Sequence, residues 1–282
     1  MILVTGATGT VGTATVAALQ AAGAPFRVGS RNPLKAQTLG ASVVELDWDR
    51  PATLEPAFAG VEKLFLLTPV SDREPEYGRA AVAAASRAGV RHILKLSVIG
   101  ADLEPGMRIG RLHREAERAI EGSGIGWTML RPNSYAQNFV NYYGVNPHKS
   151  GAVYLPHGRG GSSWVDARDV GEVAARVLTE PGHEGKAYTL TGGETVATAD
   201  AIAILAEALG RTFEYVDVPD EAAREAMSTH GAPQWMVEAL GELNSLIREG
   251  HFNGVSPAVR DVLGRPPRSF RQYAEDLAAG RA

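Results

Sequence analysis

The chain begins with the stretch Met1-Ile2-Leu3-Val4-Thr5-Gly6-Ala7-Thr8-Gly9-Thr10-Val11-Gly12. Its apolar start predicts a strand, its glycine-rich centre a tight turn, and the sequence from Thr10 to Ala22 a helix. A turn of this kind needs one glycine where φ is positive, one where backbone approaches a pyrophosphate, and one where helix and strand touch. Gly6, Gly9 and Gly12 are suited to these three positions.

The start of the predicted helix is a candidate anion site. Backbone N–H groups and the positive end of the helix dipole favour phosphate there. The residues expected to hold a dinucleotide at this turn are Gly6, Thr8, Gly9, Thr10, Val11 and Gly12. The alternative is an ordinary strand–helix turn. The strand before the glycines and the helix after them favour the dinucleotide site.

The end of the second predicted strand, 26–29, indicates which dinucleotide fits. Folds that select NAD usually carry Asp or Glu about 20 residues after the glycine turn, where the carboxylate binds the ribose 2′-hydroxyl. This chain has Ser30-Arg31-Asn32-Pro33 there, followed by Lys35. Two cations in place of a carboxylate favour NADP(H), with NAD(H) as the alternative. Arg31 could instead be a solvated loop charge.

Further candidate cofactor contacts follow the next three predicted strands, 42–46, 63–67 and 92–97. The carboxyl ends of parallel strands meet at one edge of a sheet, so the residues there can reach one ligand. These residues are Asp47, Trp48, Thr68, Pro69 and Ser97. We expect the first two beside adenine, the next two against the middle of the cofactor, and the last near the nicotinamide. Asp49 could instead be the N-cap of a helix over 51–59.

Six strand–helix units with regular glycine punctuation predict an α/β fold. We expect a doubly wound parallel sheet with helices on both faces, which is the Rossmann arrangement. The NADP-binding domain would comprise 1–133 plus 166–190. A smaller, mostly helical C-terminal substrate domain would comprise 134–165 plus 191–282, and the substrate would bind in a cleft between the two.

Composition argues against several classes of function. The sequence contains no cysteine, which excludes disulfides and thiolate chemistry. A formal net charge of −4 gives no general attraction to nucleic acid. The histidines lack metal-ligand spacing, so we predict no metal. We also see no apolar run of transmembrane length, and expect a cytoplasmic protein, with no membrane partner, that is a monomer or homodimer.

Several motifs together resemble the NmrA-like group of atypical short-chain dehydrogenase/reductases. They are the glycine turn, Ser30-Arg31-Asn32-Pro33, Leu130-Arg131-Pro132-Asn133 followed by Gln137-Asn138, Val165-Asp166-Ala167-Arg168-Asp169-Val170, and Tyr188-Thr189-Leu190-Thr191-Gly192. The resemblance implies the fold and the nicotinamide cofactor already expected. The group includes NADPH-dependent quinone reductases, triphenylmethane reductases and azoreductase-like proteins, as well as nucleotide-sensing regulators without known catalysis.

The Tyr/Lys pair of active short-chain dehydrogenases is missing. None of the 8 tyrosines has a lysine four residues later. On the helix expected to bear the pair, His113 and Glu117 have the corresponding spacing and would be neighbours on one face. His113, oriented by Glu117, could donate a proton because an imidazole titrates near neutrality. His113 could also be a polar helix residue with no chemical task. The candidate catalytic residues are His113 and Ser97.

The missing pair limits the chemistry that we expect. A ketone accepts hydride poorly unless its developing alkoxide is protonated, whereas a quinone, a polycyclic aromatic ketone or a dye delocalises the charge. We therefore expect an NAD(P)H-dependent oxidoreductase acting on such electron-deficient aromatics, with net hydroxylation through a reduced quinone as a related outcome. Candidate pocket walls are Asn133, Tyr135, Asn138 and Trp164.

Two other functions remain open from the sequence. One is a non-catalytic NADP(H)-sensing regulatory protein that acts through a protein partner. The sequence has no cluster of basic residues, which argues against DNA as a partner of such a regulator. The other is a sugar epimerase or dehydratase, which would need the same missing Tyr/Lys pair.

Overall fold

The computed structural model describes the backbone of residues 1–282 and every side chain except that of Lys35. The part of the cofactor prediction that rests on the Lys35 side chain therefore lies outside the described residues. The chain divides into two compact units, Met1–Pro132 with Ala167–Thr189 and Asn133–Asp166 with Leu190–Ala282. Each internal bound lies one residue from the division expected from the sequence.

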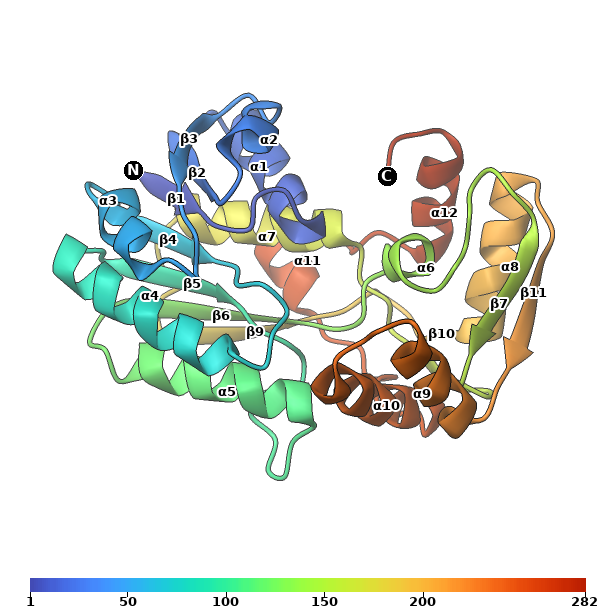
Figure 1. Ribbon diagram of the computed structural model, residues 1–282. Coiled ribbons are helices and arrows are strands. Elements are labelled where there is room, and N and C mark those ends of the chain that lie inside the picture. Colours follow the sequence, from blue (N-terminus) through green and yellow to red (C-terminus); the bar gives the residue numbers. More distant parts are fainter. The chain divides into compact units, whose positions relative to one another are not determined.

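The first unit is built on a seven-stranded sheet with strand order β3-β2-β1-β4-β5-β6-β9 (Figure 1). The strands are β1 (Ile2–Val4), β2 (Phe26–Ser30), β3 (Ser42–Glu45), β4 (Lys63–Leu66), β5 (His92–Leu96), β6 (Gly126–Pro132) and β9 (Lys186–Leu190). Every pairing from β3 to β6 is parallel. The order reverses between β1 and β4, and a ligand of such a sheet binds outside the carboxyl ends at that point. The predicted doubly wound α/β fold is confirmed.

Helices cover both faces of this sheet. Figure 1 shows α1 (Thr10–Ala21) and α7 (Ala167–Thr179) on one face, and α4 (Glu74–Ala88) and α5 (Arg108–Glu121) on the other. The remaining elements of this unit are α2 (Pro33–Gln37), the 3₁₀ turn η1 (Pro51–Thr53) and α3 (Leu54–Phe58). Gly171 allows α7 to approach α1 closely, because a Cβ there would lie 2.6 Å from the Ala14 carbonyl carbon.

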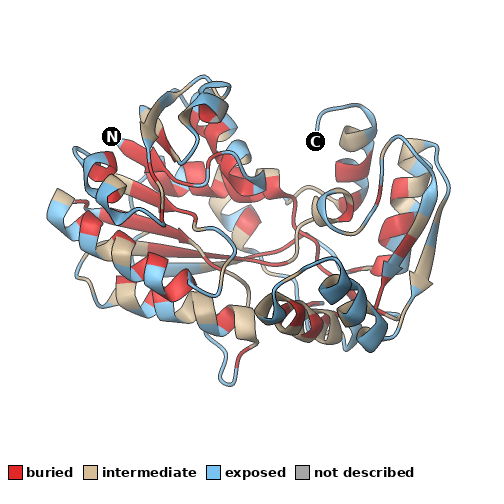
Figure 2. Ribbon diagram, in the orientation of Figure 1, coloured by how far each residue is buried: buried red, intermediate tan, exposed pale blue. Residues whose placement is uncertain are grey.

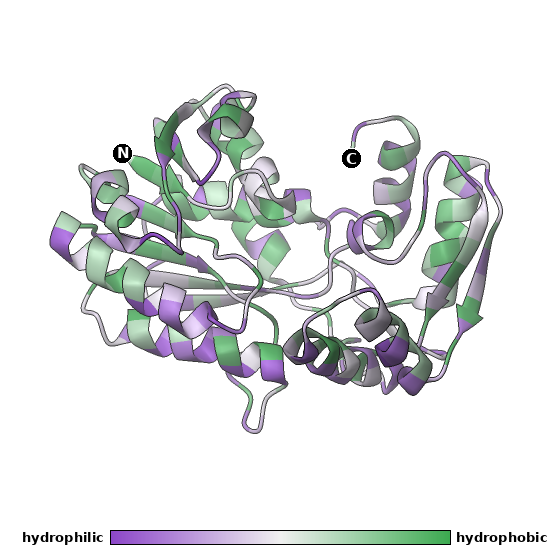
Figure 3. Ribbon diagram, viewed as in Figure 1, coloured by the Kyte–Doolittle hydropathy of each residue, from purple (hydrophilic) through white to green (hydrophobic). Residues whose placement is uncertain are grey.

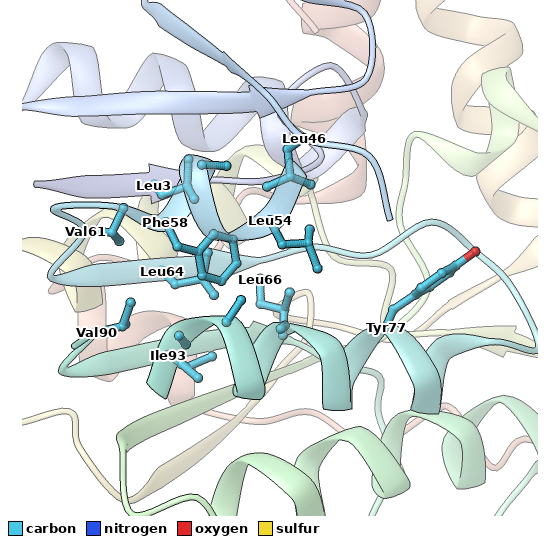
Figure 4. Packing of buried hydrophobic residues seen from close by; sticks show 14 of the residues in the cluster. Leu3, Leu46, Leu54, Phe58, Val61, Leu64, Leu66, Tyr77, Val90 and Ile93 are labelled. Atoms are coloured by element: carbon cyan, nitrogen blue, oxygen red, sulfur yellow. The ribbon is translucent and has the colours of Figure 1, made fainter. Parts of the chain in front are cut away.

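The main hydrophobic core of the first unit lies between the sheet and helices α3, α4 and α5. Figure 4 shows Leu64 and Leu66 of β4 pointing toward this face, as two-residue alternation requires. They pack with Phe58 of α3 and Ile93 of β5. The strands are largely buried in Figure 2, and hydrophilic residues recur along α4 and α5 in Figure 3. The core therefore fixes the strand ends whose residues form the candidate site.

The second unit contains two small two-stranded sheets and several helices. β7 (Gly151–Leu155) pairs in parallel with β11 (Phe213–Asp217), and β8 (Gly161–Ser162) pairs antiparallel with β10 (Val196–Ala197). Each strand of the second pair is only two residues long. The helices are α6 (Asn138–Asn141), α8 (Thr198–Leu209), α9 (Asp220–Thr229), α10 (Gln234–Arg248), α11 (Ala258–Leu263) and α12 (Phe270–Ala278).

None of the helices in the described chain combines the length and the apolar character needed to cross a membrane.

Candidate cofactor and active site

The glycine turn has the geometry that a pyrophosphate requires. Gly6 adopts φ +61°, a conformation that side chains disfavour. A Cβ on Gly12 would lie 2.2 Å from the Gly6 carbonyl oxygen, so helix α1 can start this close to β1 only with glycine there. A Cβ on Gly9 would meet only that oxygen, at 3.4 Å, which leaves space beside the turn. Gly9 is the N-cap of α1, and no side chain caps the helix.

The residues around these glycines complete a candidate phosphate site. Thr8 and Thr10 are exposed beside the turn, whereas Val11 is buried, so only its backbone could reach a ligand. The hydroxyl of Thr5 accepts a hydrogen bond from Leu67 N at 2.8 Å and thereby ties the end of β1 to that of β4. This contact sets Thr68 and Pro69, which follow β4, at the switch point of the sheet. The arrangement fits a dinucleotide pyrophosphate at the N-terminus of α1.

Arg31 is an exposed cation after β2. Within the described side chains it makes no hydrogen bond and no ion pair, yet its charge helps to lower the pKa of Asp47. The main cause of that lowering is the hydrogen bond from Arg50, whose Nε lies 3.0 Å from Asp47 Oδ2. One oxygen of the Asp47 carboxylate is therefore occupied by Arg50 of the same loop. Arg31 is available to a phosphate at this edge of the sheet.

Trp48 and Asp49 do not have the roles that the sequence indicated. Trp48 is only 8% exposed, belongs to the core and packs against Tyr77, with ring centroids 6.0 Å apart. Its indole therefore presents no open face to an adenine. Asp49 accepts hydrogen bonds from Arg73 at 2.6 Å and from the Tyr77 hydroxyl at 3.1 Å. Because Arg50 occupies the N-cap of the following 3₁₀ turn, the capping role predicted for Asp49 is wrong.

A buried cluster of ionisable groups joins the end of strand β5 to helices α4 and α5. Lys95 Nζ contacts Glu74 Oε1 at 2.7 Å and His113 Nδ1 at 3.2 Å, and it also donates to the Leu96 carbonyl oxygen. The Lys95 and Glu74 side chains are 0% and 3% exposed, and His113 is 23% exposed. The Thr68 hydroxyl donates to the second carboxylate oxygen of Glu74. Thr68 and His113, both predicted site residues, are thus joined through one buried ion pair.

Burial and charge set the protonation states in this cluster. Burial alone would raise the pKa of Glu74, but the Lys95 ammonium outweighs it and holds that pKa below its ordinary value. Burial, followed by the charge of Lys95, lowers the pKa of His113 to about 4. His113 is therefore neutral at pH 7. The expectation that it titrates near neutrality is wrong.

Glu117 does not orient His113, contrary to the prediction. Arg131 holds the Glu117 carboxylate in a two-point contact, with Nε to Oε1 at 3.0 Å and Nη2 to Oε2 at 2.7 Å. Arg114 donates to the same carboxylate at 2.9 Å. Burial would raise the pKa of Glu117, but the hydrogen bonds from Arg131 lower it overall. Arg131 also pairs with Asp102 at 2.6 Å, so these charges tie α5, β6 and the loop before α5 together.

Ser97 lies at the carboxyl end of β5, on the same strand face as Lys95. Its backbone N–H donates to the Leu130 carbonyl oxygen at 2.7 Å, and the residue is 5% exposed. The hydroxyl lies near the Glu117 carboxylate, but in a geometry that forms no hydrogen bond within the described structure. A buried hydroxyl without a partner is uncommon. Ser97 therefore has hydrogen-bonding capacity left for a ligand.

Sequence reasoning missed Glu74, Lys95 and Arg131 as members of this site. A single lysine inside the apolar strand 92–96 was a usable signal, because a buried lysine needs a partner. No comparable signal marks Glu74, whose partners come from other elements.

In the second unit, Asn133 is a structural residue and not a free pocket wall. Its Nδ2 donates to Ser163 Oγ at 2.8 Å and to the Phe252 carbonyl oxygen at 3.0 Å. Its Oδ1 accepts from Ser134 N at 2.7 Å and from Ser162 Oγ at 3.0 Å. The side chain is 2% exposed. These four bonds leave Asn133 no amide group to offer a substrate.

Trp164 is likewise part of the core of its unit. Its Nε1 donates to the Val196 carbonyl oxygen at 2.9 Å, and its ring packs edge-on against Phe139 at 5.0 Å. The prediction that it lines a pocket is wrong for this reason. Tyr135 and Asn138 are only half-buried and stay candidates for substrate contact. Burial raises the pKa of the Tyr135 hydroxyl above its ordinary value, so it is neutral at pH 7.

Among the described residues, no three His, Cys, Asp or Glu side chains come together as a metal site.

Comparison with known proteins places the whole chain in one group. The NmrA-like family model matches residues 1–273. NAD(P)H azoreductase of Xenophilus azovorans is 38% identical over 282 residues, which cover 99% of this chain and 98% of that protein. A (4-alkanoyl-5-oxo-2,5-dihydrofuran-3-yl)methyl phosphate reductase of Streptomyces griseus is 37% identical, again over 99% of this chain and 98% of its own.

Two solved structures show the same fold at lower identity. The Escherichia coli quinone oxidoreductase QOR2 in complex with NADPH superimposes with a TM-score of 0.84 at 29% identity, covering 98% of this chain and 99% of the other. The Citrobacter sp. triphenylmethane reductase complexed with NADP(H) gives a TM-score of 0.80 at 27% identity, over 98% and 99% of the two chains. From its glycine turn to its C-terminal helices, this chain belongs to the NmrA-like family.

Proposed function

We propose that this protein is an NAD(P)H-dependent oxidoreductase that delivers hydride to an electron-deficient aromatic, such as a quinone or an azo dye. One observation carries the proposal. The glycine turn before α1 has no side-chain cap, and Arg31, which makes no ion pair within the described side chains, lies at the same carboxyl edge of the parallel sheet. Full-length similarity to an azoreductase, and to a quinone oxidoreductase of the same fold, supports the class of reaction.

The residues of the first unit fit a nicotinamide dinucleotide. The turn Gly6–Gly12 and the N-terminus of α1 would hold the pyrophosphate, and Arg31 the 2′-phosphate. Thr68 and Pro69 would flank the middle of the molecule, and the unpartnered hydroxyl of Ser97 would bind near its nicotinamide end. Such a cofactor, when bound, supplies a hydride. Arg31 favours NADPH over NADH, because a guanidinium matches a phosphate in charge and geometry.

The protein side of the chemistry centres on His113. Because its imidazole is neutral at pH 7, His113 can stabilise developing negative charge by hydrogen bonding but carries no extra proton to transfer. A conjugated acceptor needs no more than this, since water can protonate a delocalised anion afterwards. A simple ketone needs a proton donor at its alkoxide, and the Tyr/Lys pair that would provide it is missing from the sequence. Tyr135 and Asn138 are the proposed substrate contacts from the second unit.

The test is NADPH oxidation with a panel of acceptors, each repeated with NADH. We expect turnover with a naphthoquinone and an azo dye, a preference for NADPH, and no turnover with a simple ketone. Turnover of the ketone at a similar rate would contradict the proposal. If no acceptor is reduced while calorimetry still shows NADPH binding, the protein is better described as an NADP(H) sensor with a protein partner.

A further inference from the structure

The Lys95 ammonium lies among three acceptor atoms, one of which belongs to a carboxylate. An ammonium has three N–H donors and no acceptor. Lys95 Nζ has three acceptors within reach: Glu74 Oε1 at 2.7 Å, His113 Nδ1 at 3.2 Å and the Leu96 carbonyl oxygen. A neutral amine would leave the buried Glu74 carboxylate without a compensating charge at 2.7 Å. The buried contacts of Lys95 are therefore those of the charged form.

The distances around His113 decide which ring nitrogen carries the proton. Nδ1 lies within hydrogen-bond distance of Lys95 Nζ but 3.6 Å from Glu74 Oε1, which is too far for a hydrogen bond. Because an ammonium can only donate, Nδ1 must accept, and an accepting Nδ1 carries no hydrogen. Glu74 does not compete for that bond, because its two oxygens face Lys95 and the Thr68 hydroxyl.

The other nitrogen of His113 faces away from this cluster. Nε2 makes no hydrogen bond within the described structure, and it is not among the buried atoms that lack a partner. The His113 side chain is 23% exposed, so Nε2 is the ring atom that a ligand can reach. In the neutral imidazole the single N–H lies there.

We propose that the buried Glu74–Lys95 pair is a positioning element that fixes His113 as the neutral Nε2–H tautomer, so that His113 offers substrates a hydrogen-bond donor. This inference rests on the proposed reductase function and narrows its substrate class. The Lys95 and Glu74 side chains are only 0% and 3% exposed, which leaves them little surface for a ligand. They act through His113, in the way that a second group fixes the tautomer of a catalytic histidine.

The Nε2–H donor of His113 favours substrates in which the atom that gains negative charge on reduction has a lone pair for a hydrogen bond. A quinone gains one hydride and one proton to become a hydroquinone. His113 would hydrogen-bond the oxygen that becomes negative, and water would supply the proton. An azo nitrogen offers the same kind of acceptor. A triphenylmethane dye differs, because hydride neutralises its cationic carbon, no anion forms and no proton is required. Reduction of such a dye should be indifferent to the state of His113.

The charged groups that face His113 come from three elements, namely Lys95 of β5, Glu74 of α4 and Glu117 of α5. The Lys95 charge disfavours the imidazolium, and the two carboxylates favour it. Removing only the lysine charge should therefore leave His113 beside the uncompensated Glu74. In a Lys95→Met variant we expect the pKa of His113 to rise, and Nδ1 to lose the donor that keeps the proton on Nε2.

The direct test is ¹⁵N NMR of the imidazole rings in the cofactor-free wild-type protein at pH 7. A His113→Asn spectrum identifies the signals. We expect one protonated and one unprotonated nitrogen, with the proton on Nε2. A proton on Nδ1, or two protonated nitrogens, would overturn the proposal. This measurement needs no folded Lys95 variant and no turnover, so its outcome is independent of whether the protein proves to be a reductase.

The second test uses Lys95→Met and asks for a change specific to His113. The ring signals of His157, which bonds to Thr198 and Asn244 in the other unit, provide an internal control and should not shift. Quinone reduction should fall by roughly tenfold or more in kcat, while the KM for NADPH and the rate with a triphenylmethane dye stay nearly constant. An equal loss with quinone and dye would indicate general damage and contradict a role in orienting the donor.

Discussion

Gly12 lies so close to Gly6 that a Cβ on Gly12 would be 2.2 Å from the Gly6 carbonyl oxygen. No change of rotamer can relieve such a contact, because the Gly6 oxygen belongs to the backbone and the position of a Cβ is fixed by the backbone that carries it. Gly9, three residues earlier, has extended backbone angles and a single neighbour at 3.4 Å. Gly12 and Gly9 therefore serve different purposes in one turn. Gly12 is needed for folding, whereas Gly9 leaves room for a ligand.

Alanine variants should separate these two purposes. We expect Gly12→Ala to lower the free energy of unfolding by about 2 kcal/mol or more, because overpacked backbone must shift. Gly9→Ala should leave that free energy within about 0.5 kcal/mol of wild type but weaken NADPH binding by roughly tenfold or more, because its Cβ fills the space beside the turn. Urea unfolding and calorimetry measure the two effects. Unchanged NADPH affinity in Gly9→Ala would argue against a pyrophosphate at this turn.

Arg31→Ala should reduce the preference for NADPH. A hydrogen-bonded charge pair contributes about 1.5–3 kcal/mol, so the affinity for NADPH should fall by roughly ten- to a hundredfold while that for NADH hardly changes. Arg73→Ala is the matched control, because Arg73 is also an exposed arginine but pairs with Asp49 and Glu76. Equal losses for both dinucleotides in Arg31→Ala would mean that Arg31 does not contact a 2′-phosphate.

The turn and the sheet could be predicted because their signals are local. Glycine spacing, apolar runs and helix ends all lie within a few residues of the element that they define. The environment of His113 could not be predicted in this way. Its spacing to Glu117 suggested a pair, yet the contacts that matter come from Lys95 and Glu74, on a different strand and a different helix. Helix spacing identifies neighbours on one helix but not the elements packed against it.

The two tryptophans illustrate a second limit. Trp48 and Trp164 follow or precede strand ends, where an aromatic ring could cover a ligand, but both are buried in the cores of their units. A large aromatic side chain contributes as much to a core as to a binding site, and the sequence does not distinguish the two uses. Asn133 shows the same limit. Apart from Ser134, the partners of its four hydrogen bonds are far from it in the sequence, so no local pattern reveals its structural role.

Asn133→Ala should therefore affect stability before it affects substrate binding. Removing the amide leaves the Ser162 hydroxyl and the Ser134 N–H without the oxygen that accepts their hydrogen bonds, at a cost of about 1–3 kcal/mol for each unsatisfied group. We expect a lower unfolding midpoint in urea. Asn138→Ala, at a half-buried position, should leave the midpoint nearly unchanged and alter the KM for the acceptor instead. The reverse pattern would return Asn133 to the list of substrate contacts.

Acidification should destabilise the protein before its carboxylates titrate. Burial is the main cause that lowers the pKa of both His92 and His157 to about 4, and the two residues are 3% and 0% exposed. Above pH 6.5 these histidines are neutral in the folded and the unfolded chain alike. As the pH falls from 6.5 toward 4, only the unfolded chain gains their protons, so stability declines with falling pH.

At pH 5 the loss relative to pH 7 should be about 2 kcal/mol for each fully buried histidine. Urea unfolding followed by tryptophan fluorescence measures it, since Trp48 lies in the first unit and Trp164 in the second. His157→Gln retains a side chain that can hydrogen-bond Thr198 or Asn244 but cannot titrate, so its stability should depend less on pH than that of wild type. Equal pH dependence in the variant and wild type would mean that His157 is protonated in the folded protein, contrary to its burial.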